Sequence, residues 1–238
     1  MPTFLLYTLL YINGQSVNST QAFDILTSEI LKPVGTCTSA SSQNCQDTIS
    51  AAHDAFKGWS QTNISTRIRI FTKAAELLEG GDWKDRIITS ITEETGASLD
   101  VAMFKYATAA KILQYTITTQ IIGRTSPLTR SPSIDVHTDK HLLGLITQSP
   151  WNAPVALTLR AITMPILCGN TVVFRPFELS PQFVYEILEE AGSPDEVFNS
   201  LSIRKEAAPP LTPTLEFGKS RSPGSDRVGK IRSYRCSL

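Results

Sequence analysis

Apolar side chains recur at helical spacing through much of the first half of the chain. Between Ile49 and Trp59 they fall at every third or fourth position, so that they line one face of a helix. Such stripes are far more typical of a packed core than of a ligand-binding surface. The pattern predicts four helices, over residues 49–59, from a capping Ser65 to Gly80, over residues 83–95 and over residues 99–122.

Residues 144–192 follow a different order, in which short apolar runs alternate with helix-length segments. The predicted elements are a strand over 145–148, a helix over 155–167, a strand over 171–174 and a helix from Ser180 to Ala191. Short joints between such elements indicate a parallel sheet covered by helices. Ligands of these sheets bind beyond the carboxyl ends of the strands, where residues 150–152 and 175–178 stand.

The two ends of the chain are less regular. An apolar run over residues 5–12 followed by Asn13-Gly14 predicts a hairpin, with residues 23–26 as the second strand. Residues 35–44 are small and polar and are predicted to be a loop. We divide the chain into residues 1–122 as the hairpin and helical part, 123–143 as an arm-like strand region, 144–203 as a partial dinucleotide-binding core and 204–238 as a divergent basic tail.

Composition narrows the class of protein. The 238 residues are 41% hydrophobic and 18% charged, with no net charge, which is typical of a globular protein with no overall attraction to nucleic acid or membrane. The four cysteines show no metal-ligand spacing, and we predict no metal site. The apolar N-terminus has no basic segment or cleavage site of a secretion signal, so we expect a cytoplasmic protein.

Several pieces of sequence resemble one protein family: PWNAP at residues 150–154, CGNTVVFRPFE at 168–178, SP at 180–181 and EAG at 190–192. Together they resemble the cofactor-binding core of the NAD(P)-dependent aldehyde dehydrogenase superfamily. The sequence around Arg160 and Cys168 is most similar to that of the branch that acts on aromatic aldehydes such as salicylaldehyde or vanillin. The resemblance implies an α/β fold with an incomplete Rossmann-type parallel sheet, an oxidoreductase function, and NAD or NADP as cofactor.

The resemblance also implies site residues. Asn152 would be catalytic, because its side-chain amide would donate to the developing alkoxide of the substrate. Glu178 would accept hydrogen bonds from the ribose. Arg175 stands where the family usually has lysine. Its forked guanidinium group either favours the 2′-phosphate of NADP or weakens the usual contact with the cofactor's ribose. Taken singly, Asn152 is also typical of a turn and Glu178 of a surface acid. The implied cofactor-binding residues are Trp151, Arg175, Glu178, Gly224 and Ser225.

Gly224 and Ser225 match a family loop in which glycine and serine at a helix N-terminus approach the pyrophosphate. In the family a hydrophobic strand leads into this loop. Residues 216–223 are a poor strand by their sequence, so we expect the loop residues to lack the scaffold that aims them.

The family's nucleophilic cysteine and general-base glutamate have no counterpart in the resemblance, which covers about residues 5–203 and 224–231. None of the four cysteines matches the nucleophile: Cys37, Cys45, Cys168 and Cys236. We therefore expect a truncated chain without a catalytic domain, inactive alone. Three alternatives stay open. The chain could be a nucleotide-binding pseudoenzyme, or it could form a homo-oligomer or pair with a full-length relative through residues 123–143. The tail could also be a reading-frame artefact.

Overall fold

A central mixed sheet organises the part of the chain that this computed structural model describes, namely residues 6–26, 33–125, 145–148, 152–176, 180, 182–203 and 219–221. The strand order is β3-β2-β8-β7-β6-β9. The strands are β2 (Leu10–Ile12), β3 (Gln15–Val17), β6 (Leu145–Gln148), β7 (Val172–Arg175), β8 (Phe198–Ser200) and β9 (Lys219–Arg221).

Four neighbouring strands of this sheet are parallel. β7 pairs with β6 on one side and with β8 on the other, and β6 pairs in turn with β9. The register places Val173 opposite both Ile146 and Asn199. The helices α5 (Pro154–Leu167) and α6 (Gln182–Glu190) make the crossovers between the parallel strands. The predicted α/β fold with a parallel Rossmann-type sheet is confirmed.

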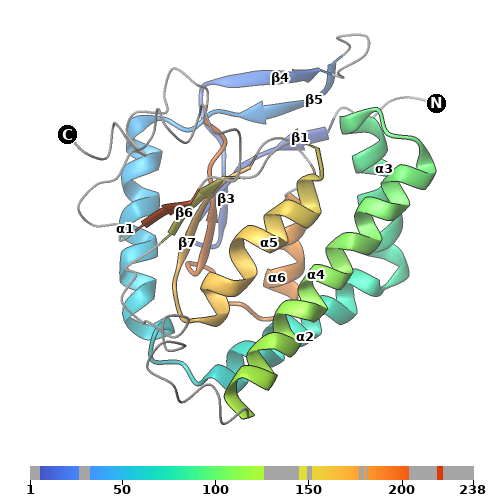
Figure 1. Cartoon of the computed structure of the whole chain (residues 1–238). Helices are drawn as coiled ribbons and strands as arrows, with labels where there is room; N and C mark the ends of the chain where they lie inside the picture. The colour runs from blue at the N-terminus through green and yellow to red at the C-terminus, as the bar shows by residue number, and fades with distance from the viewer. Residues whose placement is uncertain are drawn as a thin grey trace.

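Helices cover both faces of the sheet (Figure 1). Helix α1 (Ser42–Trp59) lies on one face, and α5 and α6 lie on the other. Beyond them, α2 (Ile64–Glu79), α3 (Gly81–Thr95) and α4 (Leu99–Thr125) form an outer layer. The four helices predicted from apolar spacing are therefore confirmed.

The alternation of side chains along β7 explains why both faces need cover. Val172 and Phe174 join the large core shared by α2 to α6, whereas Val173 points to the opposite face. There it packs in a smaller core with Leu10 of β2 and Ile49 of α1. All three β7 residues are almost fully buried. The strand is thus apolar on both faces, as expected for a parallel sheet between two helical layers.

The N-terminal region differs from its prediction. The hairpin at Asn13-Gly14 is confirmed, with positive φ at both residues, but its second strand is β3 and not residues 23–26. The apolar run over residues 5–12 is divided between two sheets. The second sheet has the order β1-β5-β4 and contains β1 (Leu6–Thr8), β4 (Ala22–Leu26) and β5 (Pro33–Thr38). The loop predicted over residues 35–44 is therefore wrong at both ends. Residues 35–38 belong to β5, which pairs with β1 and β4, and residues 42–44 form the start of α1.

Helix ends follow ordinary capping chemistry, with one correction. Asn63, and not the predicted Ser65, caps α2, since its side-chain oxygen accepts a hydrogen bond from the Ser65 amide at 2.9 Å. Gly96 ends α3 in the left-handed conformation with a φ of 64°. Ser41 caps α1 in a reciprocal arrangement with Asn44.

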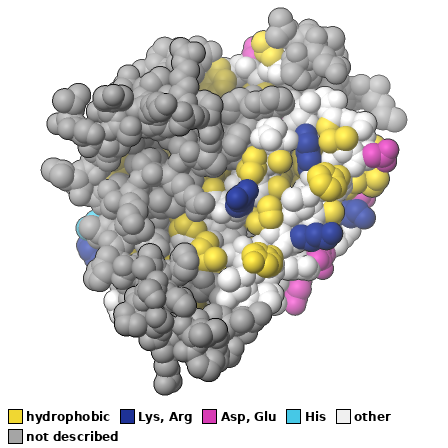
Figure 2. Space-filling view, viewed as in Figure 1, with side chains coloured by type: hydrophobic (Ala, Val, Ile, Leu, Met, Phe, Trp, Pro, Cys, Tyr) yellow, Lys and Arg dark blue, Asp and Glu magenta, His cyan; other side chains and the backbone are white. Residues whose placement is uncertain are grey.

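The outer surface of α4 carries exposed apolar side chains. Figure 2 shows this side of the molecule, where apolar side chains lie among Lys and Arg side chains. Among the described residues, the exposed large apolar side chains of α4 are Leu99, Val101, Met103, Phe104 and Tyr115. No helix within the described ranges is long and apolar enough to cross a membrane.

Candidate functional site

The carboxyl ends of the parallel strands meet at one edge of the sheet. Gln148 ends β6 directly opposite Arg175 at the end of β7, and Arg221 ends β9 on the other side of β6. Since α5 follows β6 and α6 follows β7, both helices begin at this edge. This carboxyl edge brings together a cationic side chain and two helix N-termini, which is where open α/β sheets bind ligands.

Asn152 lies in the turn that leads into α5 and is exposed. Pro154 occupies the first turn of the helix, and Ala153 before it offers no side-chain cap. The first amides of α5 therefore have no capping side chain to compensate their partial positive charge. The exposed amide of Asn152 and the start of α5 both belong to the carboxyl edge.

Arg175 lies half-buried at the end of β7. Its Nη2 donates a 2.6 Å hydrogen bond to the carbonyl oxygen of Ile203, which follows β8. One nitrogen of the fork thus ties the ends of two neighbouring strands together. The guanidinium places a positive charge at this edge.

Most of the predicted cofactor-binding residues lie outside the described residues: Trp151, Glu178, Gly224 and Ser225. The same holds for most of the arm over residues 123–143 and of the tail over residues 204–238. Of the predicted site residues, the structure therefore places Asn152 and Arg175 at the carboxyl edge.

The strand before Gly224 corrects one expectation. Residues 216–223 were predicted to be a poor strand, yet Lys219–Arg221 form β9, which runs parallel to β6. Their side chains gave no apolar signal, because an edge strand is held by backbone hydrogen bonds along one side and tolerates polar residues. The backbone that leads toward Gly224 thus belongs to the same sheet as β6 and β7.

Sequence reasoning missed a buried carboxylate beside the start of α6. Glu94, near the end of α3, accepts a 3.0 Å hydrogen bond from the backbone amide of Ser180 and another from its hydroxyl. Ser90 lies one turn earlier on α3, and its hydroxyl is 3.2 Å from that of Ser180. All three residues are buried. The sequence predicted a helix beginning at Ser180, and this prediction did not indicate Glu94 as its partner.

The chemistry of the carboxyl edge fits a dinucleotide. A pyrophosphate carries negative charge, and the edge offers the Arg175 cation and the amino-terminal ends of α5 and α6. The exposed Asn152 amide adds a neutral donor beside them.

No cysteine in the described residues lies at the carboxyl edge as an exposed thiol. Cys168 caps the opposite end of α5, and a helix of 14 residues is about 20 Å long. Burial raises the pKa of Cys168, while the nearby Arg67 acts to lower it. Burial also raises the pKa of Cys45, and Cys37 is buried in the second sheet. These thiols have the environment of packing residues and not of nucleophiles.

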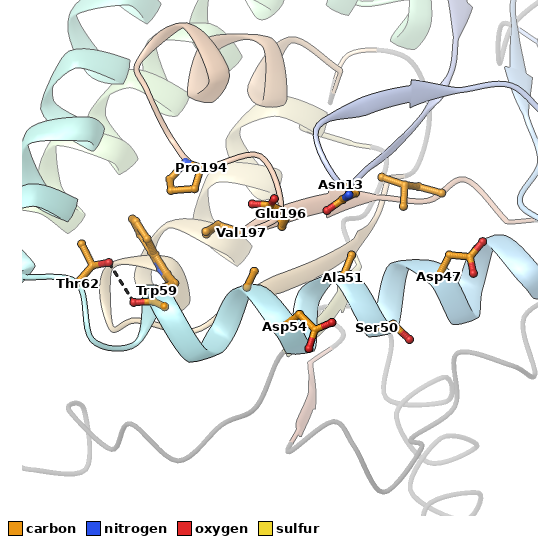
Figure 3. A pocket seen from close by; sticks show the side chains of 13 residues that line it. Asn13, Asp47, Ser50, Ala51, Asp54, Trp59, Thr62, Pro194, Glu196 and Val197 are labelled. Carbon is orange, nitrogen blue, oxygen red and sulfur yellow. Dashed lines mark hydrogen bonds between the residues drawn. The ribbon is translucent and has the colours of Figure 1, made fainter.

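A groove of about 840 Å³ lies at the other end of the sheet (Figure 3). It runs along α1 and is closed by the turn at Asn13 and by the segment before β8. Asp47, Asp54 and Glu196 are among its lining residues, and no predicted site residue is. Their negative charges disfavour a dinucleotide, which is itself anionic. Within the described residues, no group of three His, Cys, Asp or Glu side chains is placed to hold a metal ion.

Comparison of the sequence with known proteins gives a consistent result. The sequence model of the aldehyde dehydrogenase family matches residues 15–234. A salicylaldehyde dehydrogenase of Pseudomonas putida is 31% identical over 97% of this chain and 50% of its own length. A vanillin dehydrogenase of Pseudomonas sp. (strain HR199 / DSM 7063) is 33% identical over 87% of this chain and 44% of its own. The chain spans about half the length of the curated relatives it matches.

Solved structures show the same relationship. A salicylaldehyde dehydrogenase from Pseudomonas putida G7 complexed with salicylaldehyde has a TM-score of 0.82 at 25% identity, over 98% of this chain and 50% of that chain. A 1-pyrroline-5-carboxylate dehydrogenase from Thermus with bound NAD has a TM-score of 0.83 at 26% identity, over 97% of this chain and 46% of that chain.

Proposed function

Because this chain belongs to the aldehyde dehydrogenase family, we propose that its carboxyl edge binds the dinucleotide of an NAD(P)⁺-dependent aldehyde oxidation. The observation that carries this proposal is the parallel register of β6 and β7, which places the Arg175 cation at the edge where α5 and α6 begin. A bound dinucleotide would supply the hydride acceptor of the reaction.

Each predicted site residue has a role in this proposal. Asn152 donates its side-chain amide to the oxygen of the aldehyde as negative charge develops there. Arg175 holds an anionic group of the cofactor, and Glu178 accepts hydrogen bonds from a ribose. The other cofactor-binding residues are Trp151, Gly224 and Ser225, assigned by their positions in the sequence. Both NAD⁺ and NADP⁺ are candidates, since the Arg175 fork suits a 2′-phosphate as well as a pyrophosphate.

We propose an aromatic aldehyde as the substrate class and the corresponding carboxylic acid as the product. The support is the similarity to relatives named salicylaldehyde dehydrogenase and vanillin dehydrogenase, over most of this chain. The proposed organisation keeps residues 144–203 as the dinucleotide-binding core. A cytosolic location fits the proposal, because none of the cysteines that the structure describes is in a disulfide.

A second candidate is a nucleotide-binding pseudoenzyme that pairs with a copy of itself or with a full-length relative. The position of Cys168 favours it, because this thiol lies at the far end of α5 from Asn152. A thiol nucleophile must be placed within about 3.5 Å of the carbonyl carbon that it attacks. We therefore propose that residues 1–238 bind dinucleotide without oxidising aldehydes on their own.

Titration calorimetry with NAD⁺ and with NADP⁺ tests the binding. At least one should bind with a stoichiometry near one, and Asp54→Asn in the groove should leave the affinity unchanged. Heat from neither nucleotide would contradict the proposal. Absorbance at the NADH band with salicylaldehyde should stay flat. Turnover that Asn152→Ala abolishes would instead show a complete catalytic site.

A further inference from the structure

The carboxylate of Glu94 occupies an unusual place on its own helix. It lies in the last turn of α3, where the partial negative charge of a helix C-terminus disfavours an anion. It is also buried, with 5% of its surface exposed. A buried carboxylate at such a position is destabilising unless groups from elsewhere in the fold compensate its charge.

The start of α6 supplies that compensation. Ser180 lies two residues before Gln182, the first residue of α6, and both its amide and its hydroxyl donate to Oε2 of Glu94. Helix N-termini favour anions, so the charge that α3 opposes is stabilised by α6. At the next residue of α3, the Thr95 hydroxyl oxygen accepts a hydrogen bond from Nζ of Lys105 of α4 at 3.1 Å. Burial lowers the pKa of Lys105, while the negative charge of Glu94 acts to raise it.

This contact fixes one end of the connection between β7 and α6. The connection leaves β7 at Arg175, whose guanidinium is held by the carbonyl of Ile203, and it reaches α6 at Ser180. Both described ends are thus anchored to other parts of the molecule. Glu94 is 86 positions away from Ser180 in sequence, so the anchor ties the outer helical layer to the carboxyl edge.

We propose that Glu94 is a positioning residue of the dinucleotide-binding edge, acting through Ser180 to set where α6 begins relative to Arg175. This inference rests on the proposed function of that edge. Glu94 does not touch the ligand in this account. It holds the helix terminus that the ligand approaches, with Ser90 supporting the hydroxyl of Ser180.

The test compares Glu94→Ala, Glu94→Gln and a matched control, Glu93→Gln, one residue earlier on the same helix. Calorimetry with NAD⁺ and NADP⁺ gives both the Kd and the binding-competent fraction of each protein. Hydrogen exchange by NMR reports the Ser180 amide without ligand. We expect Glu94→Ala to raise the Kd about tenfold or more at unchanged stoichiometry and to accelerate exchange of Ser180. Glu94→Gln should fall in between, because its amide oxygen can still accept the Ser180 hydrogen bond.

The possible outcomes distinguish the positioning role of Glu94 from nucleotide binding by the carboxyl edge. A lower stoichiometry with unchanged Kd in Glu94→Ala would show a purely structural role and overturn the inference. So would an unchanged Kd together with faster exchange at Ser180. In both cases the proposed function would stand. If the wild-type chain bound neither nucleotide, the proposed function would fail, and the role of Glu94 in binding would fail with it.

Discussion

Gly169 approaches Arg67 so closely that a Cβ atom on Gly169 would lie 2.1 Å from Nη1 of the arginine. Gly169 follows the end of α5 with a φ of 91°, a conformation that side chains other than glycine rarely adopt. Arg67 is buried, and its Cζ atom lies over the ring of Trp59, 5.8 Å from the ring centroid. A side chain at position 169 would therefore be strained by this backbone conformation and would also displace the guanidinium of Arg67.

Gly169→Ala is expected to lower the free energy of unfolding by roughly 3 kcal/mol, from backbone strain and displacement of Arg67. Urea denaturation measures this value. Gly58→Ala is the matched control, because a Cβ at Gly58 in α1 meets no atom within 4 Å. That variant should be unchanged or more stable by about 0.5–1 kcal/mol, since alanine favours the helix. Equal destabilisation by both substitutions would contradict the packing explanation.

Arg175→Met should separate the two possible cofactors. The substitution removes the cation and the hydrogen bond to Ile203, and the fork is the group best suited to a 2′-phosphate. We expect the affinity for NADP⁺ to fall by about tenfold or more, and the affinity for NAD⁺ to fall less. Arg175→Lys, which keeps the charge, is the control and should lie between. Equal losses for both nucleotides would mean that Arg175 does not contact a 2′-phosphate.

The stacked rings of Tyr11 and Tyr185 predict a loss of stability at alkaline pH. Their centroids are 4.3 Å apart, and burial, with the nearby Glu186, raises the pKa of Tyr185 to about 12. Burial likewise raises the pKa of Tyr11. An unfolded chain loses these phenolic protons near pH 10, before the folded chain does. Stability is therefore maintained below about pH 10 and falls as the pH rises toward 12.

Tyr185→Phe should reduce the loss of folding stability at alkaline pH. The phenylalanine keeps the stacked ring but has no proton to lose, so the variant should retain on the order of 2 kcal/mol more of its pH 8 stability at high pH. Urea denaturation at several pH values between 8 and 12 measures the difference. The same substitution also brings the pKa of Tyr11 closer to its ordinary value, because charge on Tyr185 contributes to raising it, so both effects act in the same direction. Parallel stability curves for the two proteins would contradict the expectation.

The helices and the parallel core could be predicted because their signals are local. Apolar residues at helical spacing gave α1 to α4, and the apolar run of β7 is buried on both faces. The alternation of short strands and helices with short joints then indicated a parallel sheet. That alternation placed Asn152 and Arg175 at one edge, and the register of β6 and β7 confirms that their strands end there.

The errors arose where structure depends on distant partners. The apolar run over residues 5–12 is shared between two sheets, a division that its own pattern does not show. The small residues of β5 became a strand through pairing with β1 and β4. β9 has a polar sequence and is held by its backbone pairing with β6. The contact of Glu94 with Ser180 joins residues 86 positions apart and has no local signature.

Hydrogen–deuterium exchange mass spectrometry with and without saturating nucleotide shows where on the chain the nucleotide binds. We expect slower exchange at the starts of α5 and α6 and at the end of β7, with no change along α1 or at residues 194–197 beside the groove. Protection of the groove peptides, or no protection anywhere at saturating NAD⁺ and NADP⁺, would contradict the assignment of the carboxyl edge as the dinucleotide site.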